Sequence, residues 1–142
     1  MDGRDRKIIE ALQEDAGAPI RKISKRMRMS ESAVRKRVRR LEREGVIERY
    51  TVVVDPSKLG YNAMAVVGLD AAPEKHRDVI GELKKLDEVR KLATSTGEHM
   101  ITGVVRAHDN KELADIVLRK IGGIEGVKKV HTEVILERVK DV

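Results

Sequence analysis

Cationic side chains are concentrated at residues 35–40 of this 142-residue sequence, where they form the run RKRVRR. The run contains five Lys and Arg residues, one valine and no acid. Guanidinium and ammonium groups at this density suit the neutralisation of a polyanion such as a nucleic-acid backbone. A charge run on a helix is more often a solvated face, but such faces usually mix both signs. We therefore interpret the run as a nucleic-acid contact.

The residues around the run place it on the outer face of a helix. At about 100° per residue, the opposite side carries the apolar positions, which are Val34, Val38 and Leu41. Ser30 is a good N-cap, because its hydroxyl accepts a free N–H of the first turn. Gly45 is a good C′ residue, because it adopts the left-handed conformation without steric cost. A helix is therefore predicted over residues 31–44.

A shorter apolar stripe precedes this helix at Ile20, Ile23 and Met27. Only residues 28–30 separate the two stripes, which leaves room for a tight turn. A short helix, a tight turn and a longer basic helix form a helix-turn-helix, whose second helix suits the major groove of double-stranded DNA. The residues predicted to contact DNA are Ser30, Ser32, Arg35, Lys36, Arg39, Arg40 and Arg43. Of these, Ser32, Lys36 and Arg39 are expected at base edges, and the other arginines mainly at phosphates.

The charge distribution divides the chain at the end of this motif. Residues 1–50 carry 15 Lys and Arg against 9 Asp and Glu, whereas residues 51–142 carry 15 of each. The first part reads as a three-helix, winged-helix-like domain, with helices expected over residues 4–15 and 19–28 before the basic one. A strand is expected at residues 47–54, and residues 51–61 form a strand and linker between the two domains.

The second part, residues 62–142, alternates strands and helices. Strands are predicted at residues 63–69, 89–96, 99–107 and 127–139, and helices at residues 73–86 and 110–121. This β-α-β-β-α-β order is that of a ferredoxin-like domain, so the fold class is α+β. Its helices cover one sheet face, and the uncovered face is expected to bind a second copy of the chain.

Composition argues against several other classes of protein. The chain has no cysteine, and its four histidines show no metal-ligand spacing, so neither a metal nor another cofactor is expected. A P-loop, a G-x-S-x-G motif and a G-x-G-x-x-G motif are all missing, and so is a run of membrane-spanning length. We therefore expect a cytoplasmic protein that is not an enzyme. The 38% of charged residues and the scarcity of amides are typical of hyperthermophile proteins.

The ordered motifs make the chain resemble the Lrp/AsnC (feast/famine) family of transcriptional regulators over nearly its full length. In the amino-terminal half, the similarity lies in residues 5–12, Ser30, residues 34–37, Leu41-Glu42, Gly45-Val46-Ile47, Asp55-Pro56 and Leu59-Gly60. The β-α-β-β-α-β half that follows, residues 62–142, has the length of the corresponding half in this family. The resemblance implies binding to pseudo-palindromic promoter DNA, and homodimers that assemble into octamers or larger discs.

The resemblance also implies an amino-acid effector bound between dimers, beside the turn that joins the second and third strands of the second domain. On this sequence, the corresponding residues are Thr96, Gly97, Glu98, His99 and Met100. Thr132, in the middle of the last strand, is a further candidate for the same cleft, but strand packing explains it equally well. Met100 stands where the family commonly has Asp, a natural partner for an ammonium group. A simple α-amino acid is therefore expected to bind weakly or not at all.

Two alternatives share this architecture. Sirohaem decarboxylases resemble the same pair of modules and use histidine in the second one, but they do not need a basic recognition helix. A small-molecule sensor that does not bind DNA would not need one either. The basic run at residues 35–40 therefore favours the regulator.

Overall fold

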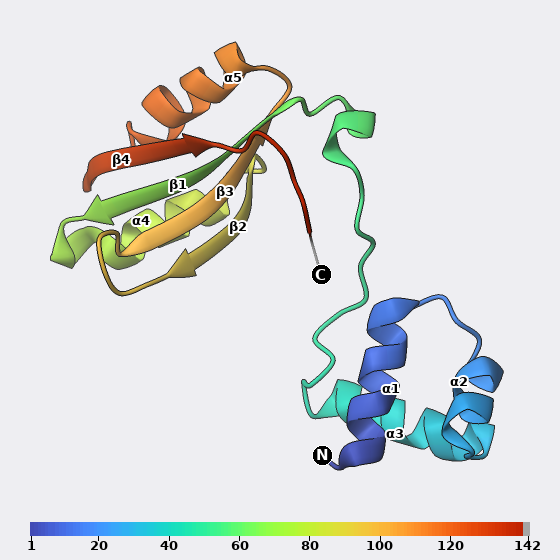
Figure 1. The fold of residues 1–142 in the computed structure, drawn as a ribbon. Coiled ribbons are helices and arrows are strands. Elements are labelled where there is room, and N and C mark those ends of the chain that lie inside the picture. Colours follow the sequence, from blue (N-terminus) through green and yellow to red (C-terminus); the bar gives the residue numbers. More distant parts are fainter. Residues whose placement is uncertain (141–142) are drawn as a thin grey trace. The chain divides into compact units, whose positions relative to one another are not determined.

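Two separate hydrophobic cores divide this chain into the units Met1–Val52 and Val53–Val142. The computed structural model describes residues 1–140 and is drawn in Figure 1. The first unit is helical, and the second contains strands and helices. The predicted α+β class, with a helix-turn-helix domain ahead of an antiparallel α+β domain, is confirmed.

Three helices form the first unit: α1 (Gly3–Glu14), α2 (Ile20–Met27) and α3 (Glu31–Arg43). Buried apolar side chains from all three helices form a single cluster, which includes Ile8, Ile23, Val34 and Val38. Burial of such side chains is worth about 1.5–3 kcal/mol each, so this small core supplies most of the stability of the unit. The core also sets, to within a slight rotation, which side of α3 faces outward.

Local capping sets the bounds of α1 and α3. Asp2 caps α1 by accepting the N–H groups of Arg4 and Asp5, and the Asp5 carboxylate accepts the Asp2 N–H in return. Ser30 caps α3 as predicted, with its hydroxyl oxygen 3.2 Å from the Ala33 nitrogen. Gly45 adopts φ +71° just beyond the helix. The helix ends at Arg43, one residue earlier than predicted.

The strand predicted at residues 47–54 is wrong, because these residues have no regular secondary structure. Their β-branched sequence suits a strand, but a strand also needs a neighbouring strand to complete its hydrogen bonds. No strand of the described chain pairs with this segment, and the side chains of Val52 and Val53 are 79% and 60% exposed. A 3₁₀ turn, Pro56–Leu59, then leads into the second unit.

The described part of the second unit is a four-stranded antiparallel sheet with the order β2-β3-β1-β4. Its strands are β1 (Ala63–Ala71), β2 (Val89–Thr94), β3 (Ile101–Ala107) and β4 (Val127–Val134). Its helices are α4 (His76–Lys84), preceded by the 3₁₀ turn Pro73–Lys75, and α5 (Asn110–Asp115), which continues as the π-helix Ile116–Ile121. This is the predicted ferredoxin-like order.

The helices cover one face of the sheet and leave the other open. Alternate residues of β1, from Ala63 to Ala71, pack with Val79 of α4 and Leu113 of α5 in one buried cluster. On the opposite face, Val66 keeps 39% of its surface exposed beside Val104, its partner on β3. The second unit therefore presents one uncovered sheet face, as the sequence predicted.

The strand predicted over residues 127–139 is five residues too long, because β4 ends at Val134. Among the described strands its only neighbour is β1, and Val134 pairs with Ala65 near the beginning of that strand. The Ile135 N–H donates to the Met64 carbonyl at 2.8 Å, and β1 begins at the preceding residue. Residues 136–140 therefore have no strand beside them. Among residues 1–140, no helix is long and apolar enough to cross a membrane.

Candidate nucleic-acid interface and effector turn

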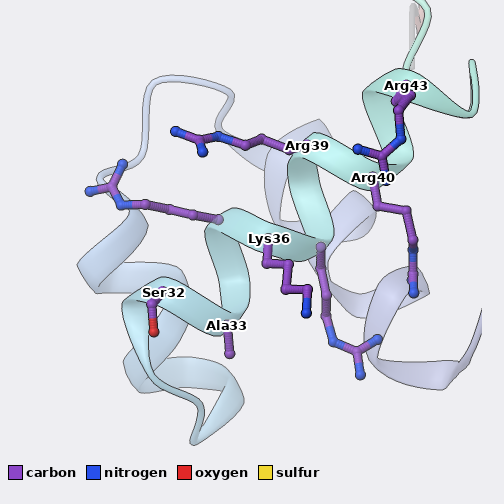
Figure 2. A pocket seen from close by; sticks show the side chains of 8 residues that line it. Ser32, Ala33, Lys36, Arg39, Arg40 and Arg43 are labelled. Carbon is purple, nitrogen blue, oxygen red and sulfur yellow. The ribbon is translucent and has the colours of Figure 1, made fainter.

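The outer face of α3 is exposed and basic. It lies on the side of the helix that faces away from the buried stripe of Val34, Val38 and Leu41. Figure 2 shows its side chains around an open hollow, which is lined by Ser32, Ala33, Arg35, Lys36, Arg37, Arg39, Arg40 and Arg43. The predicted DNA contacts on α3 therefore share one surface. Ser30 lies at its edge, with its hydroxyl 3.2 Å from that of Ser32.

Three cations of this face have no partner within the described chain. Lys36, Arg39 and Arg43 are exposed, and none of them forms an ion pair or a side-chain hydrogen bond among residues 1–140. Arg35 lies 3.8 Å from Glu31, but both side chains are about half exposed, so solvent screens the pair. These four side chains are available to an external anion.

Arg37 and Arg40 differ, because their guanidinium groups turn toward α1. Arg37 lies 2.7 Å from both Asp2 and Asp5, and Arg40 lies 2.6 Å from the other oxygen of Asp5. The Asp5 side chain is completely buried. Arg40, a predicted phosphate contact, therefore already has an internal partner, which the sequence did not reveal.

Hydrogen bonds keep both carboxylates of this group ionised. The backbone N–H of Asp5, followed by the Arg37 guanidinium, lowers the pKa of Asp2 to about 2. The backbone N–H of Asp2, followed by hydrogen bonding to Arg37 and the charge of Arg40, lowers the pKa of Asp5 in spite of its burial. Negative charge is thus fixed at the N-terminus of α1, where the helix dipole also favours it.

Five of the predicted effector residues, Thr96 to Met100, lie at or beside an exposed turn between β2 and β3. The turn is closed by the Ser95 N–H, which donates to the Met100 carbonyl at 2.9 Å. Gly97 has φ +111°, a conformation that an L-residue adopts only with strain, so this turn requires glycine. Thr96 and Glu98 are exposed on either side of it.

His99 is not at the tip of this turn, because its side chain folds back over the open sheet face. Its ring contacts that of His131 in a tilted arrangement, with the centroids 4.4 Å apart, and it packs directly against Gly68. Its Nδ1 lies 3.7 Å from Asp70, whose other oxygen accepts the Met100 N–H at 3.0 Å. Sequence reasoning missed Asp70 and His131, because the pairing of β1 with β3 brings Asp70 to the turn and the pairing of β1 with β4 brings His131 there.

Thr132 is not brought to this cluster within one chain. It pairs with Val67, whose side chain is buried under the helices, so Thr132 lies on the helix side of β4. His131, one residue earlier, lies on the open face with His99. Among residues 1–140, no group of three or more His, Cys, Asp or Glu side chains is arranged to hold a metal ion.

Comparison with known protein families defines the class. Residues 1–48 match the family described as winged helix-turn-helix DNA-binding, and residues 63–142 match the Lrp/AsnC ligand binding domain. A DNA-binding domain followed by a ligand-binding domain is the organisation of a transcriptional regulator that responds to a small molecule.

Full-length similarities identify the family. The chain is 47% identical over 140 residues to the transcriptional regulator LrpA of Pyrococcus horikoshii, covering 99% of both chains. It is 37% identical to LrpA1 of Halobacterium salinarum, covering 98% of both. Escherichia coli AsnC has the same fold, with a TM-score of 0.90 at 24% identity, over 100% of this chain and 96% of that one. A Neisseria meningitidis transcriptional regulator, solved as its L-Met complex, matches with a TM-score of 0.92 at 23% sequence identity. The match covers 99% of this chain and 93% of that one.

The chain belongs to the Lrp/AsnC family of DNA-binding transcriptional regulators. The expectation that it is not an enzyme is confirmed, because these relatives are named as regulators. The alternative of a sirohaem decarboxylase receives no support from them.

We expect Asp5→Ala to destabilise the first unit by about 3 kcal/mol. This value is at the lower end for a broken buried ion pair, because Arg37 and Arg40 keep some contact with water. Urea unfolding followed by circular dichroism measures the change. Glu10→Ala removes an exposed acid from the same helix and is the matched control, expected within about 0.5 kcal/mol of wild type. Equal stabilities of the two variants would contradict the structural role of Asp5.

Proposed function

We propose that α3 lies in the major groove of promoter DNA, with Ser32, Lys36 and Arg39 at base edges. The supporting observation is the set of exposed cations on one helix face that have no partner in the described chain. Lys and Arg bind guanine edges in the groove, and a serine hydroxyl can meet any base.

Phosphate contacts flank these base contacts in the proposed complex. Arg35 and Arg43 supply free or weakly paired guanidinium groups, and Ser30 supplies a hydroxyl at the N-terminus of α3. Arg40 keeps its bond to Asp5 and offers its remaining donors to the backbone. Such contacts set the register of the helix but carry no sequence information.

We further propose that residues 62–142 form a homodimer, which assembles into an octamer or a larger particle in the cytoplasm. The open sheet face supports this proposal, because it exposes an apolar pair, the half-exposed Val66 beside Val104, that a partner surface can cover. A second copy of the chain can supply this cover, because the same face of each copy then packs against the other in a two-fold interface.

The proposed effector is an amino acid or a related small molecule bound between dimers at the turn of residues 95–100. The match to a ligand binding domain supports a small-molecule site in this unit. The Gly97 N–H and the Thr96 hydroxyl hold a carboxylate, and Glu98 meets a cationic group. His99 and Met100 form its wall in this proposal, and Thr132 comes from another copy, because its own chain places it on the far sheet face.

For DNA binding, we expect Lys36→Ala or Arg39→Ala to weaken a specific site by about 1–3 kcal/mol. Arg43→Ala should weaken all sequences alike and flatten the salt slope by about 0.9 for each phosphate that Arg43 neutralises. Fluorescence anisotropy with a selected site and with random DNA distinguishes the two patterns. Lys84→Ala, on α4, controls for net charge. Undiminished site-specific affinity in both Lys36→Ala and Arg39→Ala would contradict the proposed orientation of α3.

For assembly, we expect Val66→Glu to convert the full chain to a monomer at micromolar concentration, because it buries a charge at the centre of the proposed interface. Light scattering measures the mass. Lys84→Glu introduces the same side chain on an exposed helix position and should leave the mass unchanged. A monomeric wild type, or an assembled Val66→Glu variant, would refute the proposal.

For the effector, a thermal-shift screen of the twenty amino acids should give few or no hits, because Met100 replaces the expected carboxylate. A ligand that binds only the folded assembly raises the melting temperature by mass action, and any such shift should vanish in Glu98→Ala. Glu74→Ala removes an exposed acid elsewhere in the same unit and is the control. Strong stabilisation that survives Glu98→Ala would place the effector at another site.

A further inference from the structure

The turn between α2 and α3 has an unusual backbone position at Arg28. Its φ of +50° and ψ of +48° are left-handed, and among residues 1–140 it is the only residue other than glycine with a positive φ. The other four positions with positive φ are Gly45, Gly60, Gly97 and Gly126. A Cβ in this conformation crowds the following carbonyl, whereas glycine avoids the contact. The chain thus uses arginine where glycine would be less strained.

The backbone of the turn does not explain the arginine. The Arg28 N–H donates to the Lys25 carbonyl at 3.2 Å, and the Met29 N–H donates to the Ser24 carbonyl at 3.0 Å. These main-chain bonds terminate α2 and would form equally well with glycine at position 28.

Contacts within the protein do not explain it either. The Arg28 side chain is exposed, and among residues 1–140 it forms no ion pair and no hydrogen bond. By contrast, Arg26, two residues earlier, forms a bidentate pair with Glu14. A strained residue whose exposed charge has no ion pair or hydrogen bond within the described chain suggests that the side chain serves an external partner.

We propose that Arg28 binds a DNA phosphate at the edge of the groove that α3 enters. It precedes Ser30, the cap of α3, by two residues, so its guanidinium extends from the turn at the same end of the helix as Ser32. A guanidinium offers paired donors that match phosphate oxygens, and the fixed backbone of the turn limits the entropy cost of binding. This inference rests on the placement of α3 against DNA.

Four variants at this position separate strain from charge. Arg28→Gly and Arg28→Asn remove the charge and tolerate the left-handed backbone. Arg28→Ala removes the charge and keeps the strain. Arg28→Lys keeps both the charge and the strain. Each is compared in the full chain by melting temperature and by DNA binding at several salt concentrations. Affinity is measured on a selected site and on random DNA.

The proposal predicts opposite effects on stability and binding. Arg28→Gly should melt at a higher temperature than Arg28→Ala, because the two differ only in the Cβ atom. All three uncharged variants should bind both DNAs on the order of tenfold more weakly at about 0.1 M salt, with a salt slope flatter by about 0.9 for each protomer bound. Arg28→Lys should keep most of the slope.

Three results would overturn the proposal. The first is unchanged affinity and salt slope in Arg28→Gly, and the second is a reduced preference for the selected site, which would indicate a base contact. The third is a lower melting temperature for Arg28→Gly than for Arg28→Ala. Arg39→Ala is measured in parallel: if it weakens specific binding while Arg28→Gly does not, Arg28 alone is wrongly assigned. If neither variant changes binding, the placement of α3 is wrong as well.

Discussion

The orientation of the recognition helix depends on one buried carboxylate. Asp5 has no exposed side-chain surface, and its two oxygens bind Arg37 and Arg40 at 2.7 and 2.6 Å. A buried charge is tolerable only when it is paired and hydrogen-bonded, so the folded unit must keep both contacts. Apolar packing alone allows a helix to rotate slightly, because side chains of similar size can exchange places. Two bonds from residues three apart on α3 restrict this rotation and direct the remaining cations outward.

This ion-pair group divides a uniform charge run into two functional sets. The sequence shows five cations at residues 35–40, but the structure uses Arg37 and Arg40 to join α3 to α1. Arg35, Lys36 and Arg39 remain accessible from the run, and Arg43 extends the accessible set along the helix. Net charge therefore overestimates the number of side chains that can release counterions from DNA. The acids that reduce this number, Asp2 and Asp5, lie more than thirty residues before Arg37 in the sequence.

Features governed by local chemistry were predictable from the sequence. The N-cap at Ser30, the left-handed Gly45 and the apolar stripe of α3 depend on neighbours within a few residues, and all agree with the structure. Features governed by strand pairing were not predictable. The position of His99 over Gly68 follows from the register that pairs Leu69 with Ile101, and its contact with His131 follows from the register that pairs Gly68 with His131. No pattern near His99 encodes either register. The same applies to Thr132, whose sheet face is set by its pairing with Val67.

The two incorrect strand predictions share a physical cause. Residues 47–54 and 136–139 have the β-branched or alternating sequence of strands, yet within the described chain neither segment lies beside another strand. Both also expose large apolar side chains, since Val52 is 79% exposed and Leu136 is 96% exposed. Unpaired apolar segments of this kind are normally covered, because their backbone groups and side chains would otherwise promote aggregation. Strand propensity without a partner in the same chain therefore adds to the case for the proposed homodimer, independently of the open sheet face around Val66.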